Sequence, residues 1–310
     1  MKSTRGLALI AFATVCIVWG TTYLAIRIAV ETIPPMLLTA TRYTVAGAVM
    51  LSICLARGQK IPRDRKKLAN LALVGVLMVG VGNLAVVWAE QWVPSGMAAL
   101  LVATAPFWNA IMEMLRSDGE RTNPRRALGL FVGFLGVAML VTPSGAAGHF
   151  DMHFVIGALV IQVGSIGWQY GTIRGKYTLG GIPLFMSASL QMLSGGVILM
   201  VVGLASGEGT RFHVTTRTLS ALAYLTVFGS LIAYSAYVYA LDHLSTTNMS
   251  LYAYVNPVVA VILGWLILNE RLTWVSIAAM CVILSGVAMV QTSRIRRKTA
   301  AQPVPDTNAA

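Results

Sequence analysis

Charged residues are scarce in this chain. They make up 11% of its 310 residues, whereas hydrophobic residues make up 56%. An average soluble domain carries about 25% charged residues. The mean hydropathy of +0.73 points in the same direction. These values exclude an ordinary soluble protein, although the length alone would permit two soluble domains.

Acidic residues and cysteines are also few. The net charge is +12 because 23 Lys and Arg residues face 11 Asp and Glu. A basic chain can bind nucleic acid, but here the basic residues are confined to short segments between apolar runs, as in membrane topology signals. The cysteines Cys16, Cys54 and Cys281 lie inside apolar runs without disulfide or metal spacing. We therefore predict no nucleic-acid partner and no disulfide framework.

Motifs for catalysis and cofactor binding are missing. The chain has no P-loop, no Rossmann glycine pattern and no His-Glu-x-x-His sequence. The metal-like spacing His149-x-Asp151-x-His153 supplies two histidines and one acid, which do not close a metal site. An intramembrane enzyme would need a buried nucleophile and base, and the histidines lie outside the apolar runs or at their ends. We predict no enzyme activity, no metal and no cofactor.

Long apolar runs dominate what remains. Each is near the ~20 residues that a helix needs to cross a bilayer. Continuous runs without strand alternation favour helices, which satisfy their own backbone in lipid. The first run is too long for a signal peptide, so we expect an uncleaved span. We predict an all-α polytopic membrane protein with ten transmembrane helices, at about 7–26, 35–56, 68–91, 94–115, 125–142, 154–174, 183–205, 218–241, 247–268 and 273–292.

The distribution of basic residues predicts the orientation. With ten spans, both termini lie on one side of the membrane. Eighteen Lys and Arg residues fall on that side, and four fall on the other, namely Arg27, Arg211, Arg217 and Arg271. Because positive residues favour the cytoplasmic side, we predict that both termini are cytoplasmic.

The two halves of the chain resemble each other. Residues 251–271 contain Pro257 and end in Glu270-Arg271, and residues 100–121 contain Pro106, 151 positions earlier, and end in Glu120-Arg121. Residues 135–139 are echoed 150 positions later by residues 285–289. Because five spans are an odd number, the second half would enter the membrane upside down, as in many secondary transporters. We predict inverted five-helix repeats at 1–145 and 152–293, followed by a tail, 294–310, that is basic and then disordered.

These features resemble a known family. Val18-Trp19-Gly20-Thr21, the two proline-containing spans and the Glu-Arg turns are similar to the drug/metabolite transporter superfamily, in its EamA-type permease branch. Gly82-Asn83, Ala89-Glu90 and residues 93–99 are similar to its YedA-like group of bacterial inner-membrane exporters. The resemblance covers nearly the whole chain. It implies a ten-helix fold with a central cavity, alternating access and export of amino acids and related metabolites. The turn at residues 117–121 departs from its compact counterpart at 268–271, which leaves the end of the fourth span open.

Polar residues inside the spans are candidates for the solute site, because polar groups at membrane depth usually face a cavity or a partner. Asn83 and Glu90 are seven positions apart on one helix face. Glu90 could contact an amine, take up a proton, or be a hydrated carboxylate at a helix end. Asn83 could line a cavity or join two helices. Arg42 could bind a substrate carboxylate, pair with Glu31, or reach outward.

Aromatic residues form the larger candidate set. Those far from the span ends could line a cavity for an amphipathic or cationic solute, or they could pack helices together. The substrate-binding candidates, aromatic and polar, are Trp19, Tyr23, Arg42, Asn83, Trp88, Glu90, Trp108, Trp168, Tyr170, Tyr234, Tyr237, Tyr252 and Asn256. Pro106 and Pro257 are hinge or kink candidates, because proline removes a backbone hydrogen bond.

We therefore predict an inner-membrane secondary transporter that exports small metabolites, such as amino acids or similar amphipathic solutes, by alternating access. Its partners are the lipid bilayer, the solute and, as a candidate coupling ion, the proton. A monomer would suffice, although the sequence does not determine the oligomeric state. The alternatives are a transporter of drugs or nucleotide sugars, and a membrane scaffold that transports nothing.

Overall fold

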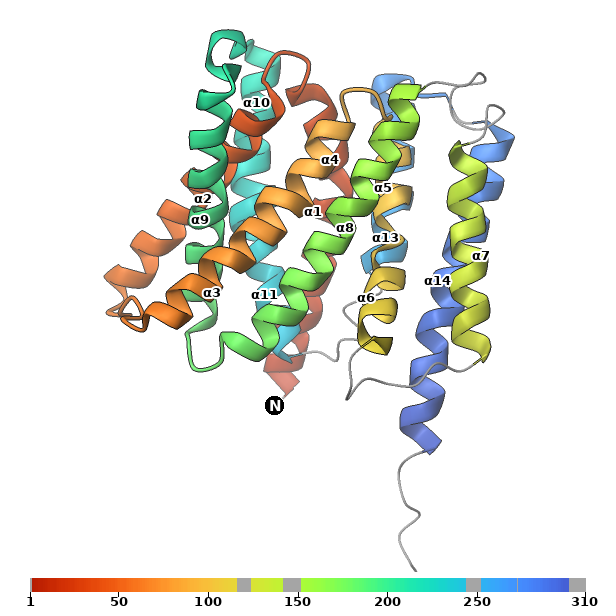
Figure 1. The fold of residues 1–310 in the computed structure, drawn as a ribbon, viewed down its shortest axis with the longest axis horizontal. Coiled ribbons are helices and arrows are strands. Elements are labelled where there is room, and N and C mark those ends of the chain that lie inside the picture. Colours follow the sequence, from red (N-terminus) through yellow and green to blue (C-terminus); the bar gives the residue numbers. More distant parts are fainter. Residues whose placement is uncertain (1, 116–123, 142–151, 244–251, 272, 301–310) are drawn as a thin grey trace, which may run out of the picture.

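The computed structural model describes residues 2–115, 124–141, 152–243, 252–271 and 273–300, and within these ranges the regular structure is helical (Figure 1). Seven helical stretches in them are long and apolar enough to cross a membrane: Gly6–Ala29, Pro35–Ala56, Arg65–Ala89, Ser95–Met112, Met152–Thr178, Leu184–Ala205 and Thr216–Ala240. Shorter apolar helices span Ala127–Met139, Val255–Leu268 and Trp274–Met289. The prediction of an α-helical polytopic membrane protein is confirmed, and the ten-span layout stays a prediction.

The elements follow the predicted apolar runs. The first half contains α1 (Lys2–Ala29), α2 (Pro35–Ala56), α3 (Arg65–Gly75), η1 (Val76–Asn83), α4 (Leu84–Ala89), α5 (Ser95–Val102), α6 (Ala105–Met114) and α7 (Pro124–Val141). The second half contains α8 (Met152–Thr178), α9 (Leu184–Ala205), η2 (Glu208–Arg211), α10 (Thr216–Tyr224), η3 (Leu225–Ile232), α11 (Ala233–His243), α13 (Tyr252–Leu268) and α14 (Trp274–Ala300).

Helices from the two halves pair with each other. At one edge of the bundle α2 packs against α9, and at the other edge α7 packs against α14 (Figure 1). Between these pairs, α1 packs against α11 and α13, while α8 packs against η1 and α4. This arrangement places α1 and α8, the first helix of each half, in the middle of the bundle.

Reciprocal glycine contacts define the geometry of the edge pairs. A Cβ on Gly47 would lie 2.9 Å from Leu193 N, and a Cβ on Gly196 would lie 2.7 Å from Thr44 N. Gly196 and Leu193 follow Gly47 and Thr44 by the same 149 positions. Later residues of α2 thus meet earlier residues of α9, so the two helices run antiparallel.

The α7–α14 pair repeats this pattern. A Cβ on Gly136 would lie 2.9 Å from Ile283 N, and a Cβ on Gly286 would lie 2.5 Å from Gly133 N. Here both separations are 150 positions. The absence of a side chain at these glycines lets backbones touch, which is the usual way that helices associate in membranes.

Two π-helical segments occupy matching positions. η1 covers Val76–Asn83 and η3 covers Leu225–Ile232, each with 8 residues, and they are separated by 149 positions. A π-helix is rare, usually limited to a single turn, and often found at functional sites. Each segment continues into an α-helix, η1 into α4 and η3 into α11.

Helix α8 packs against η1 and α4 through a glycine stripe, which consists of Gly157, Gly164, Gly171 and Gly175. A Cβ on Gly164 would lie 2.4 Å from Ala85 Cβ and 3.0 Å from Gly82 O. A Cβ on Gly157 would lie 2.6 Å from Val93, and one on Gly171 would lie 2.8 Å from Met78. These glycines therefore allow close packing of α8, except at Gly175, whose Cβ would make ordinary contacts at 3.7 Å.

We expect Gly164→Ala to destabilise the protein by about 1–3 kcal/mol, because overpacking of a tight contact displaces backbone as well as side chains. Gly175→Ala is the matched control on the same helix, and it should leave stability nearly unchanged. Thermal unfolding in detergent measures both. Equal melting temperatures for the two variants would contradict the close approach of α8 and α4.

The two prolines act differently. Before Pro106 the helical span is interrupted: α5 ends at Val102 and α6 begins at Ala105. Pro257 instead lies inside the continuous helix α13. The sequence-equivalent prolines therefore leave one span broken and the other unbroken, and their roles as hinges stay predictions.

Two glutamates from distant segments cap helix N-termini. Glu208 accepts hydrogen bonds from Leu37 N at 3.0 Å and Met36 N at 3.4 Å, at the start of α2. Glu270 accepts from Ser95 N at 2.7 Å and Gly96 N at 3.2 Å, at the start of α5. A carboxylate is favourable there because the first N–H groups of a helix lack partners and carry partial positive charge. Both caps join the second half of the chain to the first.

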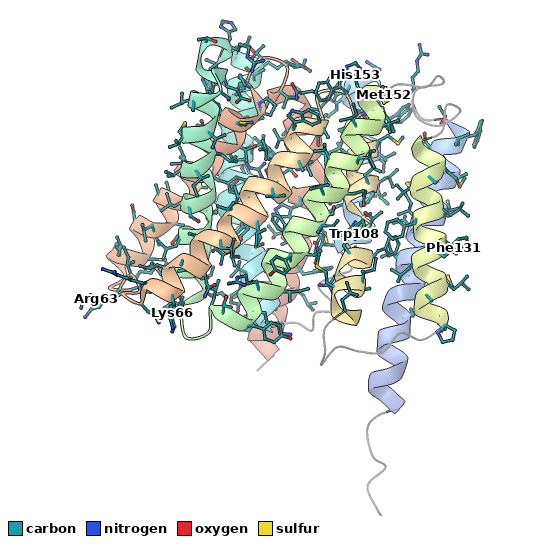
Figure 2. The ribbon with its side chains drawn as sticks, in the orientation of Figure 1. Arg63, Lys66, Trp108, Phe131, Met152 and His153 are labelled. Carbon is teal, nitrogen blue, oxygen red and sulfur yellow. The ribbon has the colours of Figure 1, made fainter. Side chains whose placement is uncertain are left out.

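The ends and flanks of the bundle differ in chemistry. Arg63 and Lys66 lie toward the end of the bundle where α1 begins, whereas Met152 and His153 lie at the opposite end (Figure 2). Phe131 on α7 is 68% exposed and points away from the bundle (Figure 2).

α14 extends to Ala300, beyond the predicted span end at 292, so the start of the predicted tail is helical. Residues 301–310 and the turn at 117–121 lie outside the described residues.

Candidate functional site

A cavity of about 700 Å³, which includes space open to solvent, lies between the two halves of the chain. Its walls come from α1, α2, η1, α4, α5, α6, α8 and α13. The lining residues are Trp19, Thr22, Tyr23, Ile26, Arg42, Tyr43, Gly82, Asn83, Val86, Val102, Ala105, Gly164, Ser165, Trp168, Gln169, Tyr252 and Asn256. A largely apolar pocket with a few polar groups is the usual form of a small-molecule site.

Aromatic rings form one wall of the cavity. The Trp19 ring meets Trp168 edge-on at 6.1 Å between centroids, and Tyr252 edge-on at 5.6 Å. Tyr237 packs behind Trp19 at 4.9 Å. The Trp19 indole N–H donates to the main-chain oxygen of Gly229 at 3.2 Å, which fixes the ring. Edge-to-face packing and a fixed N–H make this wall rigid.

Arg42 brings a positive charge to the lining. Its side chain is buried, and Nε donates to Ser230 Oγ at 2.6 Å. The guanidinium carbon lies 4.7 Å from the centroid of the Tyr43 ring. A Cβ on Gly229 would lie 3.3 Å from Nη2, so the glycine makes room for the guanidinium. In the described part of the chain, Nη1 finds no hydrogen-bond partner.

Two asparagines line the cavity in different states. Asn83 at the end of η1 has a buried Oδ1 with no hydrogen-bond partner among the described residues. The Asn256 side chain is fixed by two hydrogen bonds. Its amide nitrogen faces two main-chain carbonyl groups and donates to Cys16 O at 2.9 Å and to Tyr252 O at 3.2 Å. The second contact reaches the turn of α13 that precedes Pro257. Asn256 thus ties α13 to α1, whereas Asn83 keeps an acceptor for another donor.

Gln162 on α8 forms hydrogen bonds with the segment beside the cavity where the helix is interrupted between α5 and α6. Its Oε1 accepts from Thr104 Oγ1 and from Trp108 Nε1, each at 2.8 Å. Its Nε2 donates to Leu101 O at 3.2 Å. Backbone groups freed at a broken helix must find partners in an apolar medium. Trp108, which lies between α6 and α8 (Figure 2), therefore has a role in bracing the break.

Glu90 lies just beyond α4 and is fully buried. The Arg27 guanidinium donates to the main-chain oxygen of Glu90. Both carboxylate oxygens lack hydrogen-bond partners within the ranges that the structure describes. Arg27, Glu270 and Arg42 are the charged groups that act on this carboxylate electrostatically. Glu90 belongs to a buried charge cluster beside the cavity and does not line it.

Comparison with known proteins identifies the family. The profile of the "EamA-like transporter family" matches residues 6–142 and, a second time, residues 155–292. The chain belongs to this family. It is 38% identical over 275 residues to the "Uncharacterized inner membrane transporter YedA" of Escherichia coli (strain K12), covering 88% of this chain and 87% of that protein. It is 24% identical over 306 residues to the "Uncharacterized transporter YvbV" of Bacillus subtilis (strain 168), covering 97% and 96%.

A solved structure shares the fold of this EamA-like transporter. That crystal structure superposes with a TM-score of 0.67 at 20% identity, covering 95% of this chain and 99% of that one. At this identity the likeness concerns the fold alone. The family assignment itself makes the chain a membrane transporter and points away from an enzyme.

The cavity of this EamA-like transporter includes part of the predicted site. Seven candidates line it together: Trp19, Tyr23, Arg42, Asn83, Trp168, Tyr252 and Asn256. The other six lie outside the lining: Trp88 packs on Trp92, Trp108 bonds to Gln162, Tyr234 donates to Gln191, Tyr237 packs behind Trp19, Glu90 is enclosed, and Tyr170 is 48% exposed. Whether the lining binds the solute stays a prediction.

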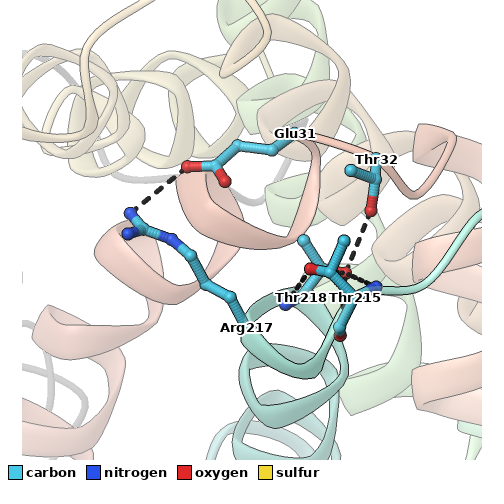
Figure 3. Close-up of polar contacts among 5 residues, drawn as sticks. All are labelled: Glu31, Thr32, Thr215, Arg217 and Thr218. Atoms are coloured by element: carbon cyan, nitrogen blue, oxygen red, sulfur yellow. Dashed lines mark hydrogen bonds and ion pairs between the residues drawn. The ribbon is translucent and has the colours of Figure 1, made fainter.

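The alternative partner proposed for Arg42 is wrong. Glu31 in the α1–α2 turn forms an ion pair with Arg217 of α10, at 3.3 Å (Figure 3). Beside it, Thr32 Oγ1 lies 2.9 Å from Thr218 Oγ1 (Figure 3). Arg42 therefore remains available to the cavity, while Glu31 helps to join α1 and α10 at the bundle end.

The sequence reasoning missed several lining residues, although a signal was present. Trp19, Thr22, Tyr23 and Ile26 are spaced as one face of a helix, so the two named aromatics imply the other two. The same spacing links Ser165 to Trp168 and Gln169. Among the described residues no group of three or more His, Cys, Asp or Glu is arranged to hold a metal ion. His149 and Asp151 lie outside those residues.

Proposed function

We propose that this EamA-like transporter is an inner-membrane secondary transporter that exports small amphipathic metabolites, such as amino acids, by alternating access. The observation that carries the proposal is the cavity, because both halves of the chain contribute to its wall. Its lining combines aromatic rings, amides and one guanidinium, a set suited to a small solute with a polar end and an apolar body.

The proposed mechanism needs two inverted five-helix repeats, at 1–145 and 152–293. The antiparallel α2–α9 and α7–α14 pairs support it, because a twofold axis in the membrane plane relates equivalent helices in that way. The matching π-helical segments η1 and η3 support it as well. Rocking of one half against the other around the cavity would then expose the solute to each side in turn.

The proposed orientation has both termini in the cytoplasm. Its support is the excess of basic residues on the side of the termini. Arg63 and Lys66 lie toward the same end of the bundle as the start of α1 (Figure 2). Glu31, Arg217 and His153 would then face the periplasm.

Transport into proteoliposomes tests the function. Purified protein is reconstituted, and uptake of a panel of labelled amino acids is measured at several pH values. We expect saturable uptake of at least one member that empty liposomes lack. Uptake confined to nucleotide sugars or lipophilic drugs would support the rival substrate classes, and no flux of any member would contradict the proposal.

Glu90 is the proposed proton-coupling residue, because its carboxylate is buried among charges and has no hydrogen-bond donor among the described residues. We expect Glu90→Gln to remove the pH dependence of transport, since glutamine keeps the shape but cannot exchange a proton. Initial rates across a pH series measure this effect. Glu31→Gln, at an exposed ion pair, is the control. A Glu90→Gln variant with the pH profile of the unmodified protein rules Glu90 out as the coupling site.

A further inference from the structure

We propose that Arg42 anchors a carboxylate of the transported solute, so that the cavity selects solutes with a free carboxylate over their amides, over phosphate esters and over cations. This inference rests on the proposed function, because it assigns the solute's chemistry within the same cavity. Arg42 is the one charged residue among the described residues of the lining, and its side chain is only 2% exposed.

No hydrogen bond joins the carboxylate of Glu270 or Glu90 to Arg42 in the described part of the chain. Glu270 accepts two backbone N–H groups at the start of α5. Glu90 interacts electrostatically with Arg42, but its hydrogen bond with Arg27 is made by its main-chain oxygen. In the described part of the chain, Arg42 forms no ion pair with a carboxylate, and the Nη1 group of its guanidinium has no hydrogen-bond partner. A buried guanidinium that lacks a hydrogen-bonded counter-charge is costly, and an anionic solute would supply one.

The guanidinium is fixed before the solute arrives. Ser230 Oγ accepts from Nε, Tyr43 lies against the guanidinium, and Gly229 leaves room for Nη2. Planar guanidinium groups bind carboxylates with two parallel hydrogen bonds, and a fixed orientation lowers the entropy lost on binding. Ser230 is thus a positioning residue. It lies in η3 of the second half, whereas Arg42 lies in α2 of the first, so the anchor is assembled from both halves.

The rest of the lining further restricts the class of solute that the cavity can bind. A nucleotide sugar carries two phosphates. The described lining holds a single arginine and no lysine or histidine, which would leave most of that charge uncompensated. A lipophilic cation would be repelled by Arg42. The buried Oδ1 of Asn83 offers an acceptor for an N–H donor. The aromatic wall of Trp19, Trp168 and Tyr252 suits an apolar body.

Equilibrium binding to the purified protein in detergent tests this anchor independently of transport. Titration calorimetry compares L-leucine and L-phenylalanine with L-leucinamide and L-phenylalaninamide, and adds phenyl phosphate and tetraphenylphosphonium. We expect at least one of the two carboxylates to bind at least about 30-fold more tightly than its amide, the range for a buried charge pair that loses one partner. We expect Arg42→Gln to abolish this preference and Arg42→Lys to retain part of it.

Ser230→Ala provides the test of positioning. We expect weaker carboxylate binding and a raised KM with little change in kcat, since the serine acts on Arg42 before the solute moves. Thermal unfolding confirms that each variant is folded. The inference is overturned if neither carboxylate binds, if amides bind as tightly, or if folded Arg42→Gln keeps the preference. Carboxylate-selective binding without transport in liposomes would leave the anchor standing and contradict the proposed function alone.

Discussion

Gly286→Val is expected to prevent α14 from docking on α7 and to leave little folded protein. A Cβ at this position would lie 2.5 Å from Gly133 N and 2.7 Å from Gly129 O. Both atoms belong to the backbone of α7, so no side-chain rotation relieves the overlap and the helices must separate. We expect a loss of about 3 kcal/mol or more, at the upper end of what overpacking costs.

The measurement is the yield of monodisperse protein by size-exclusion chromatography, followed by thermal unfolding. Gly6→Val in α1 is the matched control, because a Cβ there meets nothing within 4 Å. Both variants place the same β-branched residue in a helix, so the difference between them isolates the contact. A melting temperature for Gly286→Val close to that of the control would show that α7 and α14 do not touch in this way.

Glu270→Ala is expected to open the end of the bundle opposite the start of α1. Its carboxylate joins α5 to the end of α13 through two backbone N–H groups. Loss of such a cap costs about 1–2 kcal/mol. A change of ~1.4 kcal/mol moves a two-state equilibrium tenfold. We therefore expect the cavity to become about tenfold more accessible from that end, because α5 and α13 both contribute to its wall.

Accessibility is measured with a single cysteine, Val102→Cys, in a background without Cys16, Cys54 and Cys281. A membrane-impermeant thiol reagent is added to the outside of oriented vesicles, and the labelling rate is recorded. Glu208→Ala is the matched control, because Glu208 makes the same kind of cap on α2, away from the cavity. Equal labelling rates in the two variants would assign Glu270 a role in stability alone.

The helical fold could be predicted from the sequence because lipid leaves the backbone few choices. An apolar run of about 20 residues in a bilayer must bond to itself, and a helix does so. The glycine stripe of α8 could also be predicted, since its spacing places the glycines on one face. The interruption before Pro106 could not, because the equivalent Pro257 lies in an unbroken helix. Gln162, 58 positions from Thr104, supplies the bonds that hold the break.

The cavity could be predicted in part. Arg42 and Asn83 stood out because polar side chains are rare in apolar spans, and both line the cavity. Tyr170 stood out for the same reason as Trp168, but the two are separated by two positions and face different sides of α8. Trp88 packs against Trp92, and Tyr234 donates a hydrogen bond to Gln191, so neither lines the cavity. Residue type alone does not distinguish an aromatic side chain that lines a cavity from one that packs helices.

By itself the sequence determined that this protein is helical, lies in a membrane and repeats its own pattern, because the hydrophobic effect and backbone hydrogen bonding act on every residue wherever its neighbours lie. The tertiary structure decided which polar groups remain unpaired. Arg42 meets Ser230 across 188 positions, and Glu270 meets Ser95 across 175. Such pairs depend on which helices approach and at what depth. Glycine contacts set that approach. The unpaired guanidinium nitrogen of Arg42 in the cavity can therefore be identified only once the two halves are packed together.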